Sequence, residues 1–469
     1  MSNLLEQIFA AGVVGAGGAG FPTHRKLTPA ADTLVVNAAE CEPLLASDRY
    51  VTRTYAPEIT DALLALRGEF GFKRVVVGIK RHYTREVAAL KQAFAQKNAD
   101  FEIFGMDSFY PAGDEQIMIY EITGRVVPPG GIPIAVGVVA QNVTTVLNIY
   151  DAMHGRPVTE KFVTVTGAVA RPVIVRAPVG TSVADCVRAA GGALGPASHA
   201  CTAGWTESAR HAGTAAPAGF VIKGGPMMGK QFPFSEAGRL VIGKADGGVI
   251  VLPEGHPLCV FSQKPVTRII NEAKSVCMQC SGCTEMCPRY LIGHKLRPHI
   301  VMRGMASNRD VGDLSEALLC SECGLCELFS CPMQLSPRRV NIHVKGLLRE
   351  QGIGAADKGV YPGQSDNRGY RKASQSRIAG RLLLRGYPAQ IDEITDCVPE
   401  SVSIPLKHGV GKPSAPVVAV GDKVSAGDVI AKVEFPDVGC LVHASISGVV
   451  TRLDEGPAGS ITIARERQI

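Results

Sequence analysis

The hydrophobic positions in the first 155 residues alternate between strand-like and helix-like patterns. Three short runs are continuously apolar, and amphipathic segments separate them. Uninterrupted apolar strands between helices are typical of a parallel sheet covered on both faces, so residues 1–155 predict a Rossmann-like α/β domain. The predicted strands are Thr33–Asn37, Arg74–Ile79 and Phe101–Phe104, and the predicted helices include Ala56–Gly68 and Thr84–Gln96.

The pattern changes several times beyond residue 155. Residues 156–262 contain short β-branched runs and one helical segment near 182–190, which predicts a small α+β module. Residues 263–350 have a helical composition. Residues 351–395 are rich in Gly, Arg, Ser and Asp without a period, which predicts a linker or a partly ordered strap. Residues 396–469 consist of short strands and turns, so the chain is expected to be a multidomain α/β and α+β protein with an all-β C-terminal domain.

Composition excludes some functions. The 469 residues are 46% hydrophobic and 20% charged, as expected for several packed domains. A net charge of +6 without long runs of like charge argues against a nucleic-acid partner. The longest uncharged stretch, residues 126–150, contains three prolines and several polar side chains, so we expect no membrane span. Because the first residues also lack the basic opening of a secretory signal, we expect a cytoplasmic protein.

Eight of the 14 cysteines lie between residues 277 and 331. The first four have the bacterial ferredoxin spacing C-x2-C-x2-C-x3-C-P, and the second four differ only in the last gap. In two-cluster ferredoxins the fourth cysteine of each run binds the other cluster. We therefore predict two [4Fe–4S] clusters, one held by Cys277, Cys280, Cys283 and Cys331, and the other by Cys320, Cys323, Cys326 and Cys287. Structural zinc is the alternative, although zinc usually takes two separated cysteine pairs.

A dense glycine loop follows the first helical segment and contains Gly15, Gly17, Gly18 and Gly20. Glycine allows a backbone to lie close to a ligand, whereas a flexible turn is the alternative for such a loop alone. Polar segments favour a ligand site, because NAAECEP follows a predicted strand and would lie at the carboxyl edge of the sheet. YPAGDE at 110–115 and QNVTT at 141–145 add further polar groups.

These segments resemble a known family. GAGGAGFPTHRK, NAAECEP, YPAGDE and QNVTT are similar, in this order, to the flavin- and NADH-binding segments of the complex I flavin subunit and of the Rnf complex C subunit. FVTVTGAV and APVGTSV resemble a soluble-ligand-binding β-grasp domain, and the C-terminal segment beginning IPLKHGVGKP resembles the barrel-sandwich domain of the Rnf C subunit. The permuted domain order resembles the cobalamin reductases of propanediol-utilisation microcompartments.

The resemblance implies roles for individual residues. The loop glycines would lie against FMN, Lys26 would reach the flavin or its phosphate, and two asparagines would bond its ring or ribityl chain. The residues expected to bind FMN are Gly15, Gly17, Gly18, Gly20, Lys26, Asn37, Asn142 and Thr145. The residues expected on the NADH side are Phe21, Glu42, Asp114 and Glu115, of which Glu42 and Glu115 would be catalytic.

The family resemblance also implies a reaction. NADH delivers two electrons as a hydride and a cluster accepts one, so a flavin must lie between them. The chain would be an NADH-oxidising reductase in which electrons pass from FMN to the first cluster and then to the second. Its acceptor would be a corrinoid, or a corrinoid-dependent enzyme or adenosyltransferase, in or beside a bacterial microcompartment whose shell protein would be a further partner.

Two alternatives stay open. The chain could instead be an Rnf C-like subunit that recycles NADH to flavodoxin, ferredoxin or a shell cluster protein. It could also be a non-catalytic adaptor whose clusters are structural. The sequence does not distinguish NADH from NADPH.

Overall fold

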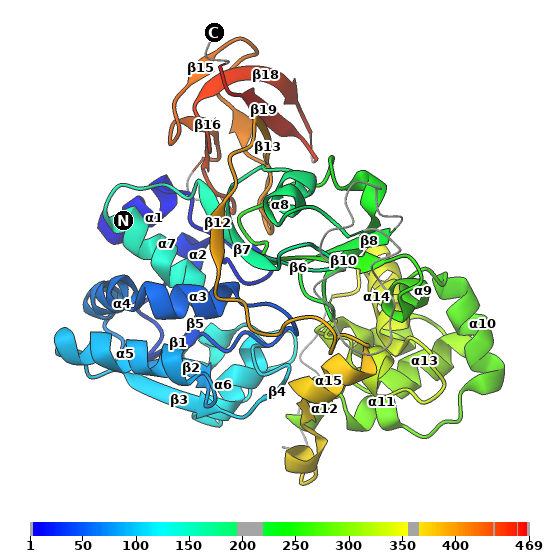
Figure 1. The fold of residues 1–469 in the computed structure, drawn as a ribbon. Coiled ribbons are helices and arrows are strands. Elements are labelled where there is room, and N and C mark those ends of the chain that lie inside the picture. Colours follow the sequence, from blue (N-terminus) through cyan, green and yellow to red (C-terminus); the bar gives the residue numbers. More distant parts are fainter. Residues whose placement is uncertain (1–2, 195–218, 355–364, 435–436, 457, 467–469) are drawn as a thin grey trace.

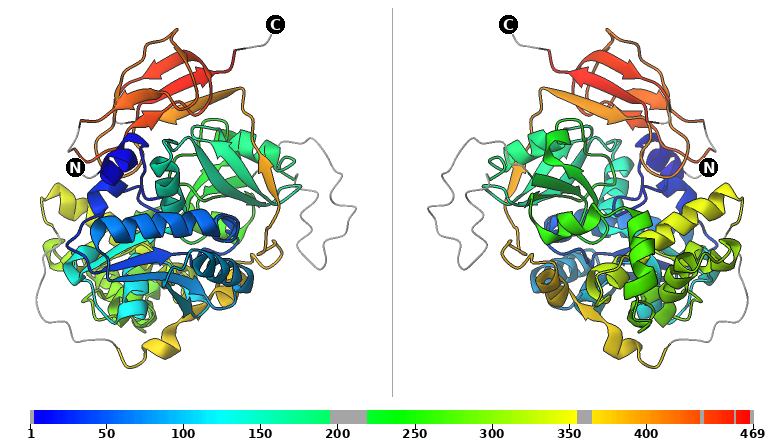
Figure 2. Two further views of the ribbon diagram at one scale, coloured as in Figure 1. Left: turned by 90° about the vertical axis from the view of Figure 1, so that its left-hand side faces the viewer. Right: turned by 90° about the vertical axis from the view of Figure 1, so that its right-hand side faces the viewer.

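The computed structural model describes residues 3–194, 219–354, 365–434, 437–456 and 458–466. These residues form four domains (Figure 1). The N-terminal α/β domain and the helical domain lie side by side, the second β-rich domain lies above them, and the C-terminal β-domain covers the top (Figures 1 and 2). None of the helices in the described ranges has the length and apolar character that a membrane crossing requires.

The N-terminal domain contains a parallel sheet, as predicted, but with a fourth strand, β5, that the sequence pattern did not predict. Its strand order is β3-β2-β1-β5, and every neighbouring pair is parallel. The apolar runs are the strands, although the third begins one residue later and ends two residues later than expected. The strands are β1 (Thr33–Asn37), β2 (Arg74–Lys80), β3 (Glu102–Met106) and β5 (Val138–Asn142).

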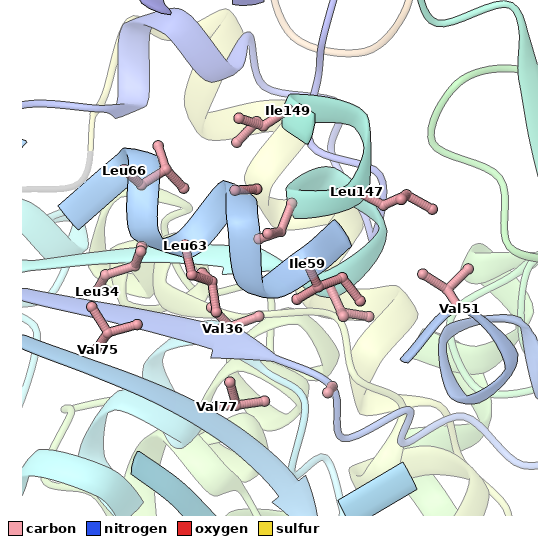
Figure 3. Close-up of a cluster of buried hydrophobic side chains, with 14 of the residues drawn as sticks. Leu34, Val36, Val51, Ile59, Leu63, Leu66, Val75, Val77, Leu147 and Ile149 are labelled. Atoms are coloured by element: carbon pink, nitrogen blue, oxygen red, sulfur yellow. The ribbon is translucent and has the colours of Figure 1, made fainter. Parts of the chain in front are cut away.

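Helices cover both faces of this sheet. Leu34 and Val36 of β1 pack with Ile59 and Leu63 of α4 on one face (Figure 3), whereas Val35 packs with α6 on the other. The alternation follows from the period of two along a strand. The helices are α1 (Asn3–Ala10), α2 (Thr23–Lys26), α3 (Ser47–Thr54), α4 (Ala56–Phe70), α5 (Thr84–Gln96), α6 (Glu115–Thr123), η1 (Pro133–Val136) and α7 (Val143–Met153).

The second domain is built on a mixed six-stranded sheet with the order β12-β7-β6-β10-β8-β9, in which β12 (Ile394–Asp396) comes from much later in the chain. Helix α8 packs on it through Val183, Cys186 and Val187 and is capped by Ser182, whose hydroxyl accepts from the Asp185 N–H. The elements are β6 (Glu160–Gly167), β7 (Val173–Pro178), α8 (Val183–Ala189), β8 (Gly219–Lys223), β9 (Lys230–Pro233), η4 (Phe234–Glu236) and β10 (Gly248–Pro253).

The third domain is helical and carries the eight clustered cysteines. Its core contains Ile269, Val301, Val340 and Val344, which come from three helices far apart in sequence. The elements are α9 (Pro257–Ser262), α10 (Val266–Val276), α11 (Gly282–Glu285), α12 (Pro288–Leu291), α13 (Pro298–Ala306), η5 (Gly312–Leu319), η6 (Leu325–Phe329) and α14 (Pro337–Glu350).

Residues 365–396 connect the helical domain to the C-terminal domain and touch three domains on the way. Strand β11 pairs with β4 (Phe109–Tyr110) of the N-terminal domain, and β12 joins the second sheet beside β7. Arg371 forms an ion pair with Glu285 of the helical domain. The elements of this strap are η7 (Arg368–Arg371), β11 (Ala373–Ser374), α15 (Gln375–Arg381) and β12 (Ile394–Asp396).

The C-terminal domain is all-β, as predicted. Two small sheets, with the orders β13-β19-β18-β15 and β14-β16-β17, enclose a core that includes Ile404, Ile430 and Ile461. The strands are β13 (Ser401–Pro405), β14 (Ala415–Pro416), β15 (Lys423–Val424), β16 (Val429–Lys432), β17 (Val442–His443), β18 (Gly448–Asp454) and β19 (Ser460–Ala464).

Candidate functional site

A cavity of about 350 Å³ lies where β1 and β5 end. It is open to solvent and large enough for part of a dinucleotide or a flavin. The structure brings almost all of the predicted flavin and NADH residues to its wall. The predicted residues that line it are Gly15, Gly17, Gly18, Gly20, Phe21, Lys26, Asn37, Glu42, Asp114, Glu115 and Asn142.

Thr145 is the exception and does not line the cavity. It lies in the first turn of α7 and is fully buried, and its hydroxyl accepts a 2.8 Å hydrogen bond from the Ala16 N–H. The QNVTT motif continues from a strand into a helix, and the helix turns this side chain towards the glycine loop. Thr145 therefore contacts the loop, not the space that a cofactor would fill.

Two glycines of the loop, Gly17 and Gly20, have no room for a side chain, whereas a Cβ on Gly18 would meet open space. A Cβ on Gly17 would lie 2.6 Å from Nδ2 of Asn142. Gly20 has a φ of +64°, a conformation that favours glycine. Behind the loop, the fully buried Lys161 of β6 donates to the Ala16 carbonyl at 3.0 Å. The loop is thus a close-packed backbone cradle of the kind that a flat ring or a phosphate requires.

The two predicted asparagines are held by protein hydrogen bonds. Asn37 donates to the Gly113 carbonyl at 2.8 Å, and Asn142 donates to Oδ2 of Asp48 at 2.7 Å. Asn142 also caps α7 by accepting from the Thr144 N–H. Asp48, which lines the cavity, was missed by sequence reasoning because it belongs to no recognised motif and lies far from β5 in the chain.

Two carboxyl groups in the NAAECEP segment reach the cavity from inside the protein. Burial raises the pKa of Glu40 to about 8 and that of Glu42 to about 7. Both Glu42 oxygens accept backbone N–H bonds, from Met227 at 2.9 Å and Met228 at 3.0 Å. These bonds favour the ionised form but do not overcome the loss of hydration, so Glu42 is poised to change its charge near neutral pH.

The strap, residues 365–396, is hydrogen-bonded to the same NAAECEP segment. Gln375 of α15 donates to the carbonyls of Cys41 and Glu42, and its side-chain oxygen accepts from Lys80 at 2.7 Å. Lys80 also donates to the Glu40 carbonyl, and burial lowers its pKa to about 8. Sequence reasoning missed Gln375, because it lies more than 300 residues from the segment that it supports.

Asp114 and Glu115 have separate surroundings at the start of α6. Glu115 forms an ion pair with Lys26 across the cavity mouth. Asp114 caps α6 by accepting from the backbone N–H groups of Gln116 and Ile117, and it forms a 2.9 Å ion pair with Arg289. Since Arg289 follows Cys287 and Pro288, this pair joins the cavity wall to the cysteine-bearing domain.

The eight cysteines form the two predicted sets. Cys277, Cys280, Cys283 and Cys331 line one small cavity, and Cys283 interacts electrostatically with the other three. In the other set, Cys326 interacts electrostatically with Cys320, Cys323 and Cys287. The fourth cysteine of each run therefore belongs to the set that the other run mainly forms. The described ranges contain no group of three or more His, Cys, Asp or Glu side chains placed to hold a single metal ion. A [4Fe–4S] cube is wider than one ion, and a set of four thiols suits its preference for sulfur.

The two sets differ in their distance from the cavity at the ends of β1 and β5, hereafter called the large cavity to distinguish it from the small one lined by Cys283. Cys323 lines the large cavity, and the Tyr110 hydroxyl beside it donates to the Cys323 carbonyl at 2.7 Å. The set containing Cys323 is hereafter the inner set. The set containing Cys280, which is exposed, is the outer set. The first run in sequence therefore mainly forms the outer set, because the second run folds back towards β4 and the cavity.

Comparisons with known proteins agree with this geometry. Residues 8–151 match the Nuo51 FMN-binding domain, residues 162–200 the SLBB domain, residues 276–336 the 4Fe-4S dicluster domain, and residues 389–462 the RnfC barrel sandwich hybrid domain. The fold and site thus define an oxidoreductase of the iron–sulfur flavoprotein class, whose cofactors are FMN and two [4Fe–4S] clusters.

Relatives that align with nearly the whole chain narrow this class of oxidoreductases to one family. The chain is 36% identical over 468 residues to the cobalamin reductase PduS of Citrobacter freundii and to that of Salmonella typhimurium, which covers 99% of this chain and 96% of each relative. It is 31% identical over 300 residues to the C subunit of the ion-translocating oxidoreductase complex of Erwinia tasmaniensis, covering 63% of this chain and 33% of that protein. The chain belongs to the PduS cobalamin reductase family.

Proposed function

We propose that this chain oxidises NADH at the large cavity and delivers single electrons to a corrinoid. The observation that carries the proposal is that one cavity is lined by the glycine loop, by the Glu42 carboxyl group and by Cys323 of the inner set. FMN, when bound, accepts a hydride and releases electrons one at a time. The change from two-electron to one-electron transfer requires FMN to lie beside a cluster, and Cys323 is a proposed ligand of the inner cluster.

Individual residues take distinct parts in this proposal. Gly15, Gly17, Gly18 and Gly20 present backbone to FMN, and Asn37 and Asn142 orient it while they hold the ends of β1 and β5. Lys26 supplies a cation that its partner Glu115 holds in place. Phe21 is 38% exposed at the cavity and provides an apolar face for the nicotinamide side. Glu42 holds or releases a proton beside that face.

The outer set is proposed as the exit for electrons. Cys280 is exposed, and Met278 and Met333 beside it are 66% and 39% exposed. All three line or border the small cavity of the outer set. Apolar side chains around an accessible cluster favour close approach of an acceptor, because methionine adapts its shape to the surface it meets. The proposed order is therefore large cavity, inner set, outer set, corrinoid.

The test uses the whole chain, purified and reconstituted without oxygen. We expect bound FMN, about eight irons per chain, bleaching of the flavin by NADH, and formation of a reduced corrinoid in the optical spectrum. Zinc in place of iron, or a flavin that NADH does not reduce, would contradict the proposal. Comparing NADH with NADPH at equal concentration settles the donor.

The electron order has its own test. Cys323→Ser removes an inner ligand, and Cys280→Ser removes an outer one as the matched control. With NADH as donor, the Cys280→Ser protein should still show a reduced inner cluster by electron paramagnetic resonance, whereas the Cys323→Ser protein should leave the outer cluster oxidised. The opposite pattern would restore the order expected from the sequence.

A second candidate follows from the partial match to the ion-translocating complex. The exposed outer set could equally serve a small electron carrier such as a flavodoxin or ferredoxin. Reduction of a carrier protein without reduction of free corrinoid would favour this alternative. A transfer of electrons to neither acceptor would favour the adaptor hypothesis.

We also propose that the chain works inside or beside a bacterial microcompartment, in contact with a shell protein or with a corrinoid-dependent enzyme or adenosyltransferase. The family membership supports this location. Fractionation of cells that carry the tagged chain tests it, since the protein should sediment with intact compartments and be released when their shells are broken.

A further inference from the structure

The C-terminal domain touches the glycine loop directly. The Val410 N–H donates a 3.0 Å hydrogen bond to the carbonyl of Ala19, which lies inside the loop. At the other end of the loop, a Cβ on Gly12 would lie 2.3 Å from the Leu441 carbonyl. Two separate segments of the C-terminal domain therefore contact the two ends of the glycine loop, which comprises residues 12–20.

The contact between the two backbones excludes side chains on both sides. A Cβ on Gly20 would lie 2.4 Å from the His408 carbonyl, and a Cβ on Gly409 would lie 2.3 Å from the Ala19 carbonyl. Both glycines are left-handed, with φ values of +64° and +103°. Gly20 lines the large cavity, whereas Gly409 does not, so Gly409 meets the back of the same loop that faces the cavity.

A buried lysine joins three domains at the other end of the loop. Lys244 of the second domain is 1% exposed and donates to the Gly12 carbonyl at 2.8 Å and to the Leu441 carbonyl at 3.0 Å. The bond to Gly12 is buried and the bond to Leu441 is partly buried, and a buried carbonyl without its donor is costly. The position of the loop is thus tied to that of the C-terminal domain.

The composition of the loop explains why such support matters. A glycine-rich segment loses more conformational entropy on ordering than any other, so a free loop would have to be ordered by the ligand itself. Support that orders the loop beforehand removes this cost from binding. Within the N-terminal domain the loop has the Ala16 bond to Thr145 and backbone bonds to α1 and to Phe21, whereas the contacts with Lys161, Lys244, Leu441 and Val410 come from other domains.

We propose that the C-terminal β-domain is part of the flavin site, because it holds the glycine loop in the conformation that binds FMN. The inference rests on the proposed function, namely that FMN binds at the large cavity. Gly409 and Lys244 are thereby assigned as positioning residues. They act on bound FMN through the glycine loop, although neither of them lines the cavity.

Gly409→Ala tests the proposal, with Gly411→Ala as the matched control. Gly411 is also left-handed, at φ +123°, and its Cβ would lie 2.4 Å from a carbonyl, but that carbonyl belongs to Val438 of the same domain. The two substitutions therefore introduce similar strain, and only one of them pushes on the glycine loop. Lys244→Met is a second variant that leaves the C-terminal backbone unchanged.

The expected result is that Gly409→Ala and Lys244→Met weaken FMN binding by about tenfold or more, measured by fluorescence titration of flavin-free protein. Hydrogen exchange of residues 12–20 should be faster in both variants before any flavin is added. Iron content and the exchange of β18 and β19 should match the parent protein, which shows that the clusters and the C-terminal domain stay folded. Gly411→Ala should leave FMN affinity and loop exchange unchanged.

Equal FMN affinity and equal loop exchange in the parent, Gly409→Ala and Lys244→Met proteins would overturn the inference. An equal loss in Gly411→Ala would also overturn it, since the effect would then come from general damage to the domain. A parent protein that binds no FMN would instead contradict the proposed function, while the exchange measurement would still report whether the C-terminal domain orders the loop.

Discussion

The ion pair between Asp114 and Arg289 provides a sharp test of how the cavity wall is attached to the cluster-bearing domain. Both side chains are nearly buried, with exposures of 13% and 10%, and their charged atoms lie 2.9 Å apart. Arg289 has two further nitrogens, Nε and Nη1, that are buried and have no hydrogen-bond partner. Asp114 is therefore the main compensation for a buried cation, and it also caps α6.

The expected loss of stability in kcal/mol follows from these contacts. Asp114→Ala removes the cap, at about 1 kcal/mol, and leaves the buried arginine unpaired, at about 3–5 kcal/mol, for a total near 4–6 kcal/mol. Asp114→Asn keeps the cap and loses only the charge on the acceptor. In the double variant Asp114→Asn/Arg289→Met both partners are neutral, and replacement of a whole buried pair is often neutral in free energy.

Hydrogen exchange measures these effects locally, which suits a chain whose four domains need not unfold together. Asp114→Ala should speed exchange at the Gln116 and Ile117 amides by about fivefold through the lost cap. It should also speed exchange in α12, beside Arg289, by about a hundredfold or more. Asp114→Asn should leave the first turn of α6 protected, and the double variant should recover most of the protection in α12.

Two results would refute this reasoning. If the double variant exchanged as fast as Asp114→Ala, the buried charge would not be the cause. If Asp114→Asn raised the KM for NADH as much as Asp114→Ala while exchange stayed normal, Asp114 would act on the dinucleotide as the family resemblance implies, and its structural role would be secondary.

Four further predictions concern the cavity and the buried charges around it. Because the pKa of Glu42 is about 7, NADH oxidation should fall above that pH as the ionised carboxylate repels the anionic dinucleotide, and a Glu42→Gln variant whose pH profile keeps this fall would contradict the assignment. Gly17→Ala places a Cβ 2.6 Å from Asn142, so purified protein should contain much less FMN at unchanged iron content, and full flavin occupancy would count against the cradle. Native Glu40 and Glu42, with pKa values of about 8 and 7, bind protons that the unfolded chain releases near 4.5, so the melting temperature should fall as pH rises from about 5 to 8. Lys80, whose pKa is lowered to about 8, should raise the melting temperature again between pH 8 and about 10. Glu40→Gln should flatten the first slope, and an unchanged slope would show that other groups control it.

Much of the architecture was accessible from sequence because it depends on local patterns. The parallel sheet follows from apolar runs such as Thr33–Asn37, which can be buried only between two layers of helices. The placement of Cys287 and Cys331 in opposite sets was expected from the cysteine spacing, because the same spacing in two-cluster ferredoxins sends the fourth ligand to the other cluster.

The placement of individual polar side chains was less accessible. Thr145 belongs to a cofactor-like motif, yet it is fully buried against Ala16. Asp114 resembles an NADH residue, yet its partner is an arginine 175 residues away in the chain. A motif specifies which residue types gather near a ligand, but the direction of each side chain depends on where the local helix begins and on what packs against it.

The sequence alone therefore determined the kinds of domain, the parallel sheet, the glycine loop and the two groups of clustered cysteines, because each depends on spacing along a short stretch of chain. Only the tertiary structure decided which cysteine set adjoins the large cavity, that Gln375 supports the Cys41 segment, and that Gly409 presses on the glycine loop. These contacts join segments hundreds of residues apart, and they arise from the way whole domain surfaces fit together, which no local period encodes.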